Sequence, residues 1–315
     1  MTTSTAASCR TCCATSCAQR DLNTISRAHP LREALPLFLL AGLCLSSLDA
    51  TAKLLVRDHP LLLVVWARYA GQTLVVTPYA WHRAGPGFWR TQRPGMHLLR
   101  SALLLAATAC FFGALRYLPL AEGSAITFMA PMIVVALSWP VLGERPTRAR
   151  MIASIAGFAG IVILVRPGSA VLHPAVLLLL VTALFNALYQ LYTRKLRTEN
   201  PQALLFYSAL VGTVGLTLLL PFLLESTTIG LRDAGLLLAS GVFAGLGHGF
   251  MISAYSHAPA ALLAPFTYLQ IVWATLFGLV LFGQYPDGWS AVGMAVVAAS
   301  GIGLALWERR RMRLM

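Results

Sequence analysis

Apolar segments of helical length recur from Ala34 to Leu306, and this recurrence constrains the fold more than any other feature of the sequence. Each segment has the roughly 20 residues that a helix needs to cross about 30 Å of hydrocarbon. Lipid offers no hydrogen-bond partners to the backbone, so a spanning segment is either a helix or a strand of a closed barrel, and continuous apolar runs favour helices. Only 11% of the residues are charged, against about 25% in globular proteins. The sequence therefore predicts an all-α integral membrane protein.

Charged residues, proline and glycine divide the sequence into ten apolar runs joined by short connections. Their spacing predicts transmembrane helices at Ala34–Leu55, Leu61–Trp81, His97–Tyr117, Leu120–Leu142, Arg150–Val165, Pro174–Tyr192, Gln202–Leu224, Asp233–Tyr255, Ala260–Phe282 and Trp289–Trp307. Because the connections are short, we expect no soluble domain between the helices.

Lys and Arg residues gather in alternate connections. With a cytoplasmic N-terminus most of them lie at the cytoplasmic side, Arg100 included, and those left outside are Lys53, Arg57, Arg116, Arg166 and Arg232. The positive-inside rule therefore predicts a multi-pass protein of a bacterial inner (plasma) membrane with both termini in the cytoplasm. The same placement accounts for the formal charge of +13, so nucleic acid is not expected as a partner.

The sequence repeats itself with an offset of 140 residues, which maps Pro119, Ala121, Gly143 and Pro146 onto Pro259, Ala261, Gly283 and Pro286. Each half then has five helices, and because five is odd, the second half enters the membrane in the opposite orientation. Inverted repeats of this kind build many secondary transporters. We predict a disordered cytoplasmic tail at 1–33, repeats at 34–168 and 169–307, and a basic cytoplasmic tail at 308–315.

Four of the six cysteines lie in the N-terminal tail, at Cys9, Cys12, Cys13 and Cys17. This spacing is tight for a structural zinc site, which usually draws two ligand pairs from separated places. An unstructured tail is the favoured interpretation, and no metal or other cofactor is expected.

The residues also resemble a known family. The run Tyr117-Leu118-Pro119-Leu120-Ala121-Glu122, the following Pro131, the end Leu142-Gly143-Glu144-Arg145 and the glycines Gly157 and Gly160 resemble the EamA-type family of the drug/metabolite transporter superfamily. Trp66-Ala67-Arg68-Tyr69 and Tyr192-Thr193-Arg194-Lys195-Leu196 are similar to that family's second and sixth spans, and Gly283-Gln284 departs from its Gly-Glu. The resemblance implies ten helices around a central cavity and transport of metabolites such as amino acids, nucleosides or vitamins. The stretch from Leu118 to Pro131 is similar to a branch that includes S-adenosylmethionine carriers.

Polar groups within the spans are candidates for a substrate site, because such groups are expensive in lipid. The sixth span carries a stripe at three- and four-residue spacing that is either a cavity wall or polar contact between helices: Thr182, Asn186, Tyr189, Gln190 and Thr193. The ninth span has Phe266, Gln270, Trp273 and Phe277 on one face, with Tyr268 near by, which suits a small organic ligand or plain packing.

Arg68 lies too deep in the second span to belong to a connection, so it is a counter-charge for an anionic substrate group or a member of a structural ion pair. Pro131 and Pro265 interrupt the fourth and ninth spans and free backbone carbonyls there. Such interruptions in both halves are typical of the central site of a transporter.

Asp49 and Glu122 are candidates for coupling or gating, through titration during transport. The alternative for Asp49 is a surface ion pair with Lys53, four residues on, and this interpretation is preferred. In the eighth span Gly241, Gly245 and Gly249 form a face for close helix contact, where His248 is expected to be a packing residue.

The sequence thus predicts a secondary transporter that moves a small polar metabolite, an amino acid or related compound, by alternating access. Its expected partners are a small-molecule solute and membrane lipid, and a homodimer is an assembly open to it. A flippase for a lipid or lipid-linked sugar is the alternative. An integral-membrane enzyme is disfavoured because paired His ligands, a nucleophile elbow and a phosphate loop are missing from the sequence.

Overall fold

The computed structural model describes residues 30–143, 147–165, 173–196, 198–223, 229–258, 263 and 266–313, and the regular structure of these residues is helical throughout. The first half contains α2 (Pro30–Asp58), α3 (Leu61–Ala84), α4 (Pro94–Leu115), α5 (Leu120–Thr127), α6 (Ala130–Leu142) and α7 (Arg148–Val165). The second half contains α8 (Ala175–Lys195), α9 (Pro201–Leu223), α10 (Leu231–His257), α12 (Leu269–Phe282) and α13 (Gly288–Arg313).

Within these residues, seven helical segments are long and apolar enough to cross a membrane, with α5 and α6 together forming one of them. Two shorter apolar helices are α12 and the first part of α13. The predicted all-α membrane architecture is confirmed. The N-terminal cysteines and Pro265 lie outside the described residues, and α13 continues through much of the predicted basic tail.

Proline and glycine mark several helix ends, and two of the glycines are equivalent in the two halves. Pro60 and Pro119 precede the first residues of α3 and α5, where a proline ring suits the first helical turn. Gly143 and Gly283 end α6 and α12 in the left-handed conformation, with φ of 73° and 61°. Glycine reaches this conformation without a Cβ clash, so both helices stop there.

The fourth span is broken between α5 and α6, as its proline predicts. Pro131 has no N–H to bond Thr127, and its ring crowds that carbonyl, so the helix stops and restarts across Phe128 and Met129. The second half has its own boundary 140 residues later, where α12 begins after Tyr268. The rings of Phe128 and Tyr268 pack together with centroids 5.3 Å apart, so the two interruptions meet.

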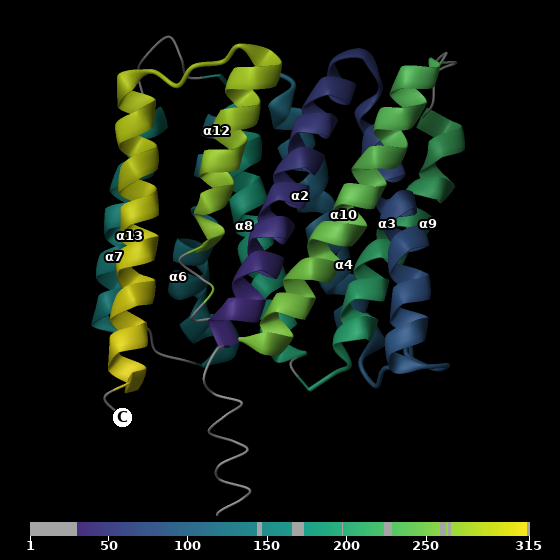
Figure 1. Ribbon diagram of the computed structural model, residues 1–315, viewed down its shortest axis with the longest axis horizontal. Coiled ribbons are helices and arrows are strands. Elements are labelled where there is room, and N and C mark those ends of the chain that lie inside the picture. Colours follow the sequence, from purple (N-terminus) through teal and green to yellow (C-terminus); the bar gives the residue numbers. More distant parts are fainter. Residues whose placement is uncertain are drawn as a thin grey trace, which may run out of the picture.

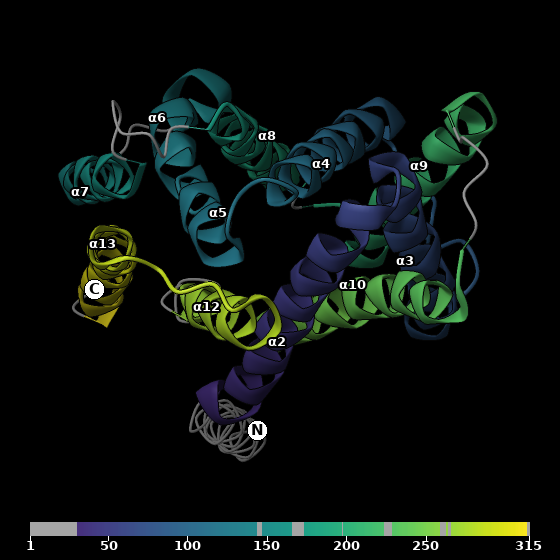
Figure 2. The same cartoon turned by 90° about the horizontal axis from the view of Figure 1, so that it is seen from above.

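Eight segments form a closed ring, which Figure 2 shows from above. Around it α2 packs on α10, α10 on α3, α3 on α9, α9 on α4, α4 on α8, α8 on α5 and α6, and α5 on α12, which returns to α2. Helices α7 and α13 pair with each other to one side of this ring. Exchanging the two halves maps the α2–α10 pair onto α8–α4 and leaves the α3–α9 and α7–α13 pairs unchanged.

The two halves run in opposite directions. We call the end of the bundle where α2 finishes the upper end, as it stands in Figure 1, and the opposite end the lower end. Lys53, near the end of α2, donates to the carbonyl of Leu115 at the end of α4, so α4 runs upward. His59 Nε2 lies 2.9 Å from Asp233 Oδ2 in the first turn of α10, so α10 runs downward. Because α4 and α10 are equivalent in the repeat, the repeat is inverted, and α2 begins and α13 ends at the lower end (Figure 1).

Candidate functional site

A cavity of about 190 Å³ lies inside the ring and is lined by six of its segments. Helices α2, α3, α4 and α5 of the first half supply most of the wall, and α8 and α12 complete it. Its polar lining consists of Ser46, Asp49, Arg68, Thr108, Ser124, Thr127, Thr182, Asn186 and Gln270, and its apolar lining of Leu45, Leu48, Leu104, Ala107, Phe111 and Phe112. The cavity therefore joins both repeats and offers charges, hydrogen-bonding groups and apolar surface to a solute.

Arg68 supplies the positive charge of the cavity. Its side chain is 4% exposed, and its guanidinium lies 4.3 Å from the ring centre of the neighbouring Tyr69. Nε and Nη1 have no hydrogen-bond partner among the described residues. Burying an arginine with open donors is unfavourable unless an anionic or accepting group fills them. This geometry suits a residue that binds an anionic or hydrogen-bond-accepting group of a solute.

Asp49 supplies the negative charge from α2. It lines the same cavity as Arg68, near enough for the two charges to act on each other. Among the described residues no ion pair joins the two side chains. Asp49 and Arg68 thus line one cavity without forming an ion pair with each other.

The polar stripe predicted on the sixth span divides between two environments. Thr182 and Asn186 line the cavity, as a wall of α8 should. Tyr189 and Thr193 lie toward the lower end, where both bond Arg100. Gln190 is exposed and does not line the cavity.

The predicted face of the ninth span also divides. Gln270 lines the central cavity and, with Phe38, Phe266 and Trp273, a second and much smaller pocket between α2, α10 and α12. Tyr268 lies away from both pockets, with its ring packed on Phe128 and against Gly301 of α13. Only Gln270 of the predicted group reaches the central cavity.

Lys53 lies buried near the upper end of α2, which contradicts the preferred interpretation of this residue as a surface partner of Asp49. Lys53 is 2% exposed, and its Nζ donates to Leu115 O at 3.0 Å and to Leu118 O. It also lies 5.4 Å from the ring centre of Phe282. Because α2 and α4 are not neighbours around the ring, these bonds tie its opposite sides together.

The two remaining gating candidates lie outside the cavity. Glu122 accepts a hydrogen bond from Ser290 Oγ at 2.9 Å and so connects α5 to the start of α13. Pro131 is exposed at the start of α6 and acts on the chain through the helix break.

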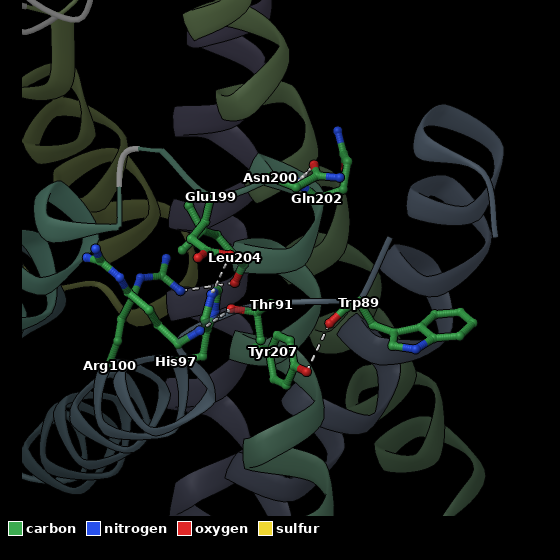
Figure 3. A network of polar contacts seen from close by, with 10 residues as sticks. Trp89, Thr91, His97, Arg100, Glu199, Asn200, Gln202, Leu204 and Tyr207 are labelled. Carbon is green, nitrogen blue, oxygen red and sulfur yellow. Dashed lines mark hydrogen bonds and ion pairs between the residues drawn. The ribbon is translucent and has the colours of Figure 1, made fainter. Parts of the chain in front are cut away.

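The lower end holds a buried arginine, Arg100, whose place in the sequence predicts only that it is one of the charges that orient the chain. Arg100 is 4% exposed and joins α4 to α8 and α9, donating to Thr193 Oγ1 at 2.6 Å, to Tyr189 Oη and Ser208 Oγ at 2.7 Å, and to Leu204 O at 3.0 Å. Figure 3 shows it beside His97, Glu199 and Tyr207. His97 is fully buried, with Nε2 3.8 Å from Glu199 Oε2 and its ring against Tyr207. Arg100 lies near the end of a span, where basic side chains usually reach water, so the sequence does not predict its burial.

Helix α10 packs closely on α3 through two of the three glycines that the sequence predicts for such a contact. A Cβ on Gly71 would lie 2.6 Å from Gly241 Cα, and one on Gly245 would lie 2.7 Å from the side chain of Val75. Gly249 has no atom within 4 Å of such a Cβ. The Nδ1 of His248 lies 2.9 Å from the carbonyl of Ala244, which satisfies that nitrogen within the helix.

An inverted repeat of membrane helices that encloses a charged and polar cavity defines the class of membrane transporters of small solutes. The sequence profile of the EamA-like transporter family matches residues 33–166 and 173–306, one copy in each half. The chain therefore belongs to the EamA-like transporter family and is a small-molecule transporter.

Several characterised relatives are similar over nearly the whole chain. The riboflavin transporter of Vibrio cholerae is 30% identical over 292 residues, covering 90% of this chain and 96% of that protein. The S-adenosylmethionine uptake transporter of Rickettsia prowazekii is 24% identical, covering 79% and 84%. The pseudopaline exporter CntI of Pseudomonas aeruginosa is 28% identical, covering 87% and 96%. A solved crystal structure with 21% identity and a TM-score of 0.66 covers 89% of this chain and 99% of its own, and shares the fold.

Proposed function

We propose that the protein is an alternating-access carrier that moves a small polar metabolite, an amino acid or a compound containing one, through the central cavity. The observation that carries the proposal is Arg68, a buried guanidinium with two donors unpaired among the described residues, in a cavity lined by both repeats. S-adenosylmethionine, named for the relatives from Rickettsia, belongs to the same chemical class and is a candidate substrate.

The direction of the molecule in the membrane follows from its charges. The lower end carries Arg83, Arg90 and Arg93 between α3 and α4, and Arg194 and Lys195 at the end of α8. The positive-inside rule then makes the lower end cytoplasmic in a bacterial inner membrane, with both termini on that side. In this orientation Lys53 closes the cavity toward the outside.

Alternating access needs two ends that open in turn around one site. The inverted repeat supplies two ends built from equivalent helices, and the Lys53 bonds between α2 and α4 close the upper one across the ring. Rocking of the two halves would release these bonds and open the upper end. A flippase for a lipid or lipid-linked sugar is the alternative, and it is distinguished by whether the purified protein in liposomes moves a soluble solute or a lipid.

The test is transport by the purified protein in liposomes, with radiolabelled amino acids and S-adenosylmethionine as solutes. Arg68→Gln removes charge-assisted bonds worth about 1.5–3 kcal/mol and should slow transport about tenfold or more. Asn186→Ala should slow it several-fold. Gln190→Ala is the matched control, since Gln190 lies one turn further along α8 and faces away from the cavity. Liposomes that move none of these solutes, or an Arg68→Gln variant as fast as the wild type, would refute the proposal.

A further inference from the structure

The repeat allows each cavity residue to be compared with its equivalent in the other half. Adding 140 residues maps Asp49 onto Tyr189 and Arg68 onto Ser208. The helices that carry these residues correspond in the same way, α2 to α8 and α3 to α9. The first pair lines the cavity, whereas the second pair lies at the lower end of the ring.

At the lower end the space between Tyr189 and Ser208 is filled by a side chain of the protein itself. The Arg100 guanidinium sits between Tyr189 and Ser208, with Nη2 donating to Tyr189 Oη at 2.7 Å and Nη1 to Ser208 Oγ at 2.7 Å. A cationic group is therefore the natural occupant of the space between these two positions of the fold.

The equivalent space between Asp49 and Arg68 has no matching arginine. The equivalent of Arg100 in α10 is Ser240, whose short side chain is fully buried and bonds Leu237 O within its own helix. Ser240 therefore cannot supply a cationic group to Asp49, and Asp49 itself lines the cavity. This asymmetry between Arg100 and Ser240 explains why the cavity is lined mainly by the first half.

We propose, on the basis of the proposed transport function, that Asp49 and Arg68 together bind a zwitterionic solute. The cationic group of the solute lies at Asp49, where the other half places the Arg100 guanidinium, and its carboxylate pairs with the Arg68 guanidinium, whose Nε and Nη1 have no partner among the described residues.

The charges around the site balance the two charged groups of an amino acid. A solute with only a carboxylate would leave Asp49 unbalanced in a medium of low dielectric constant, and one with only an amine would leave Arg68 unbalanced. The nearby ionisable groups are engaged elsewhere: Lys53 donates to carbonyls of α4 and its connection, Glu122 accepts from Ser290, and His248 bonds Ala244. Asp49 and Arg68 thus remain as one charge of each sign.

The rest of the lining offers apolar and amide groups to the side chain of the solute. Phe111, Phe112 and Leu104 offer apolar surface, and Asn186 and Gln270 offer amide groups. L-Methionine is therefore a suitable probe. Two analogues remove one charged group each: 3-methylthiopropylamine lacks the carboxylate and 4-methylthiobutanoate lacks the amine.

The experiment measures the thermal stability of the purified full-length protein in detergent with each probe, because a ligand that binds the folded state raises the melting temperature. The wild type should bind L-methionine about tenfold or more tightly than either analogue, as expected for loss of one charge-assisted bond. Asp49→Asn should invert the order in favour of 4-methylthiobutanoate. Arg68→Gln should invert it in favour of 3-methylthiopropylamine.

Gln190→Ala, which lies outside the cavity, should keep the wild-type order, and it reports whether substitution itself disturbs the fold. A wild type that binds one analogue as well as L-methionine would overturn the proposal. So would Asp49→Asn and Arg68→Gln variants that both keep the wild-type order. Liposome transport separates the two ideas. Movement of 4-methylthiobutanoate but not of L-methionine overturns the zwitterion site alone, and binding of L-methionine without any transport overturns the proposed function alone.

Discussion

The hydroxyls of Thr73 and Thr213 lie 2.8 Å apart, and the two residues are separated by the repeat offset of 140 residues. A contact between equivalent residues of two repeats lies on the axis that relates them. Thr73 and Thr213 therefore mark where the pseudo-two-fold axis passes between α3 and α9, as Phe128 and Tyr268 mark it between α5 and α12.

This threonine pair should stabilise the joint between the halves by a small, measurable amount. Each hydroxyl also lies within hydrogen-bond distance of a carbonyl in its own helix, Tyr69 O for Thr73 and Ala209 O for Thr213, so when one partner is lost the remaining hydroxyl can donate to that carbonyl. We expect the single Val variants and the double variant to give a coupling free energy of about 0.6 kcal/mol, typical of hydrogen bonds between membrane helices. Reversible unfolding in mixed detergent micelles measures it. Strict additivity of the two substitutions would show that the bond contributes nothing.

The contact of α3 with α10 should tolerate no side chain at Gly241. A Cβ at its partner, Gly71, would lie 2.6 Å from the Gly241 Cα, so the two helix backbones meet there. Gly241→Ala should lower the free energy of unfolding by about 1–3 kcal/mol, as overpacking does. Gly249→Ala on the same helix is the control, since open space surrounds its Cβ, and its unfolding should match the wild type. Equal melting temperatures for both variants would contradict the close packing.

The elements that the sequence predicts well are those with a local signature. Long apolar runs define the helices, and proline and glycine define where α3, α5, α6 and α12 begin or end. Arg68, Asn186 and Gln270 stand out because each is polar within an apolar run, and all three line the cavity.

Lys53 and Arg100 could not be predicted in the same way. Both lie near span ends, where long basic side chains usually extend toward the water. The carbonyls that Lys53 bonds are 62 and 65 residues away along the chain, and backbone carbonyls leave no trace in a sequence. The sequence therefore indicates the nearest carboxylate, Asp49, as its partner. Gln190 shows the opposite error, since its spacing matches Asn186 although it faces outward.

Arg100 should be the side chain on which the lower end depends most. Its guanidinium bonds α8 and α9 at the same time, through Tyr189 and Thr193 on one side and Ser208 and Leu204 on the other. Arg100→Leu should lower the free energy of unfolding by about 2–4 kcal/mol, because bonds to a charged group contribute about 1.5–3 kcal/mol and several are lost together.

Lysine should rescue this loss only in part. An ammonium group cannot reproduce the fork of donors that reaches two helices at once. Arg100→Lys is therefore expected to melt between the wild type and Arg100→Leu. Thermal unfolding followed by size-exclusion chromatography ranks the three proteins, and full recovery with lysine would show that charge alone suffices.

Lys53 should hold the upper end shut. Its ammonium group ties the end of α2 to the carbonyls of Leu115 and Leu118 across the ring, and Phe282 covers it. Lys53→Met keeps the length of the side chain and removes every donor, so it should shift the population of molecules toward those open at the upper end. With bonds to a charged group worth about 1.5–3 kcal/mol, the shift should be about tenfold or more.

A cysteine at Ser46, a buried residue of the cavity wall, reports the opening. In a protein whose native cysteines are replaced by serine, Lys53→Met should raise the rate at which an impermeant thiol reagent labels Ser46→Cys from the side of the upper end. Lys53→Arg retains donors for the two carbonyls and should keep the slow rate. Labelling that is equally slow in Lys53→Met would mean that apolar packing of α2, α4 and α12 closes this end without help from the lysine.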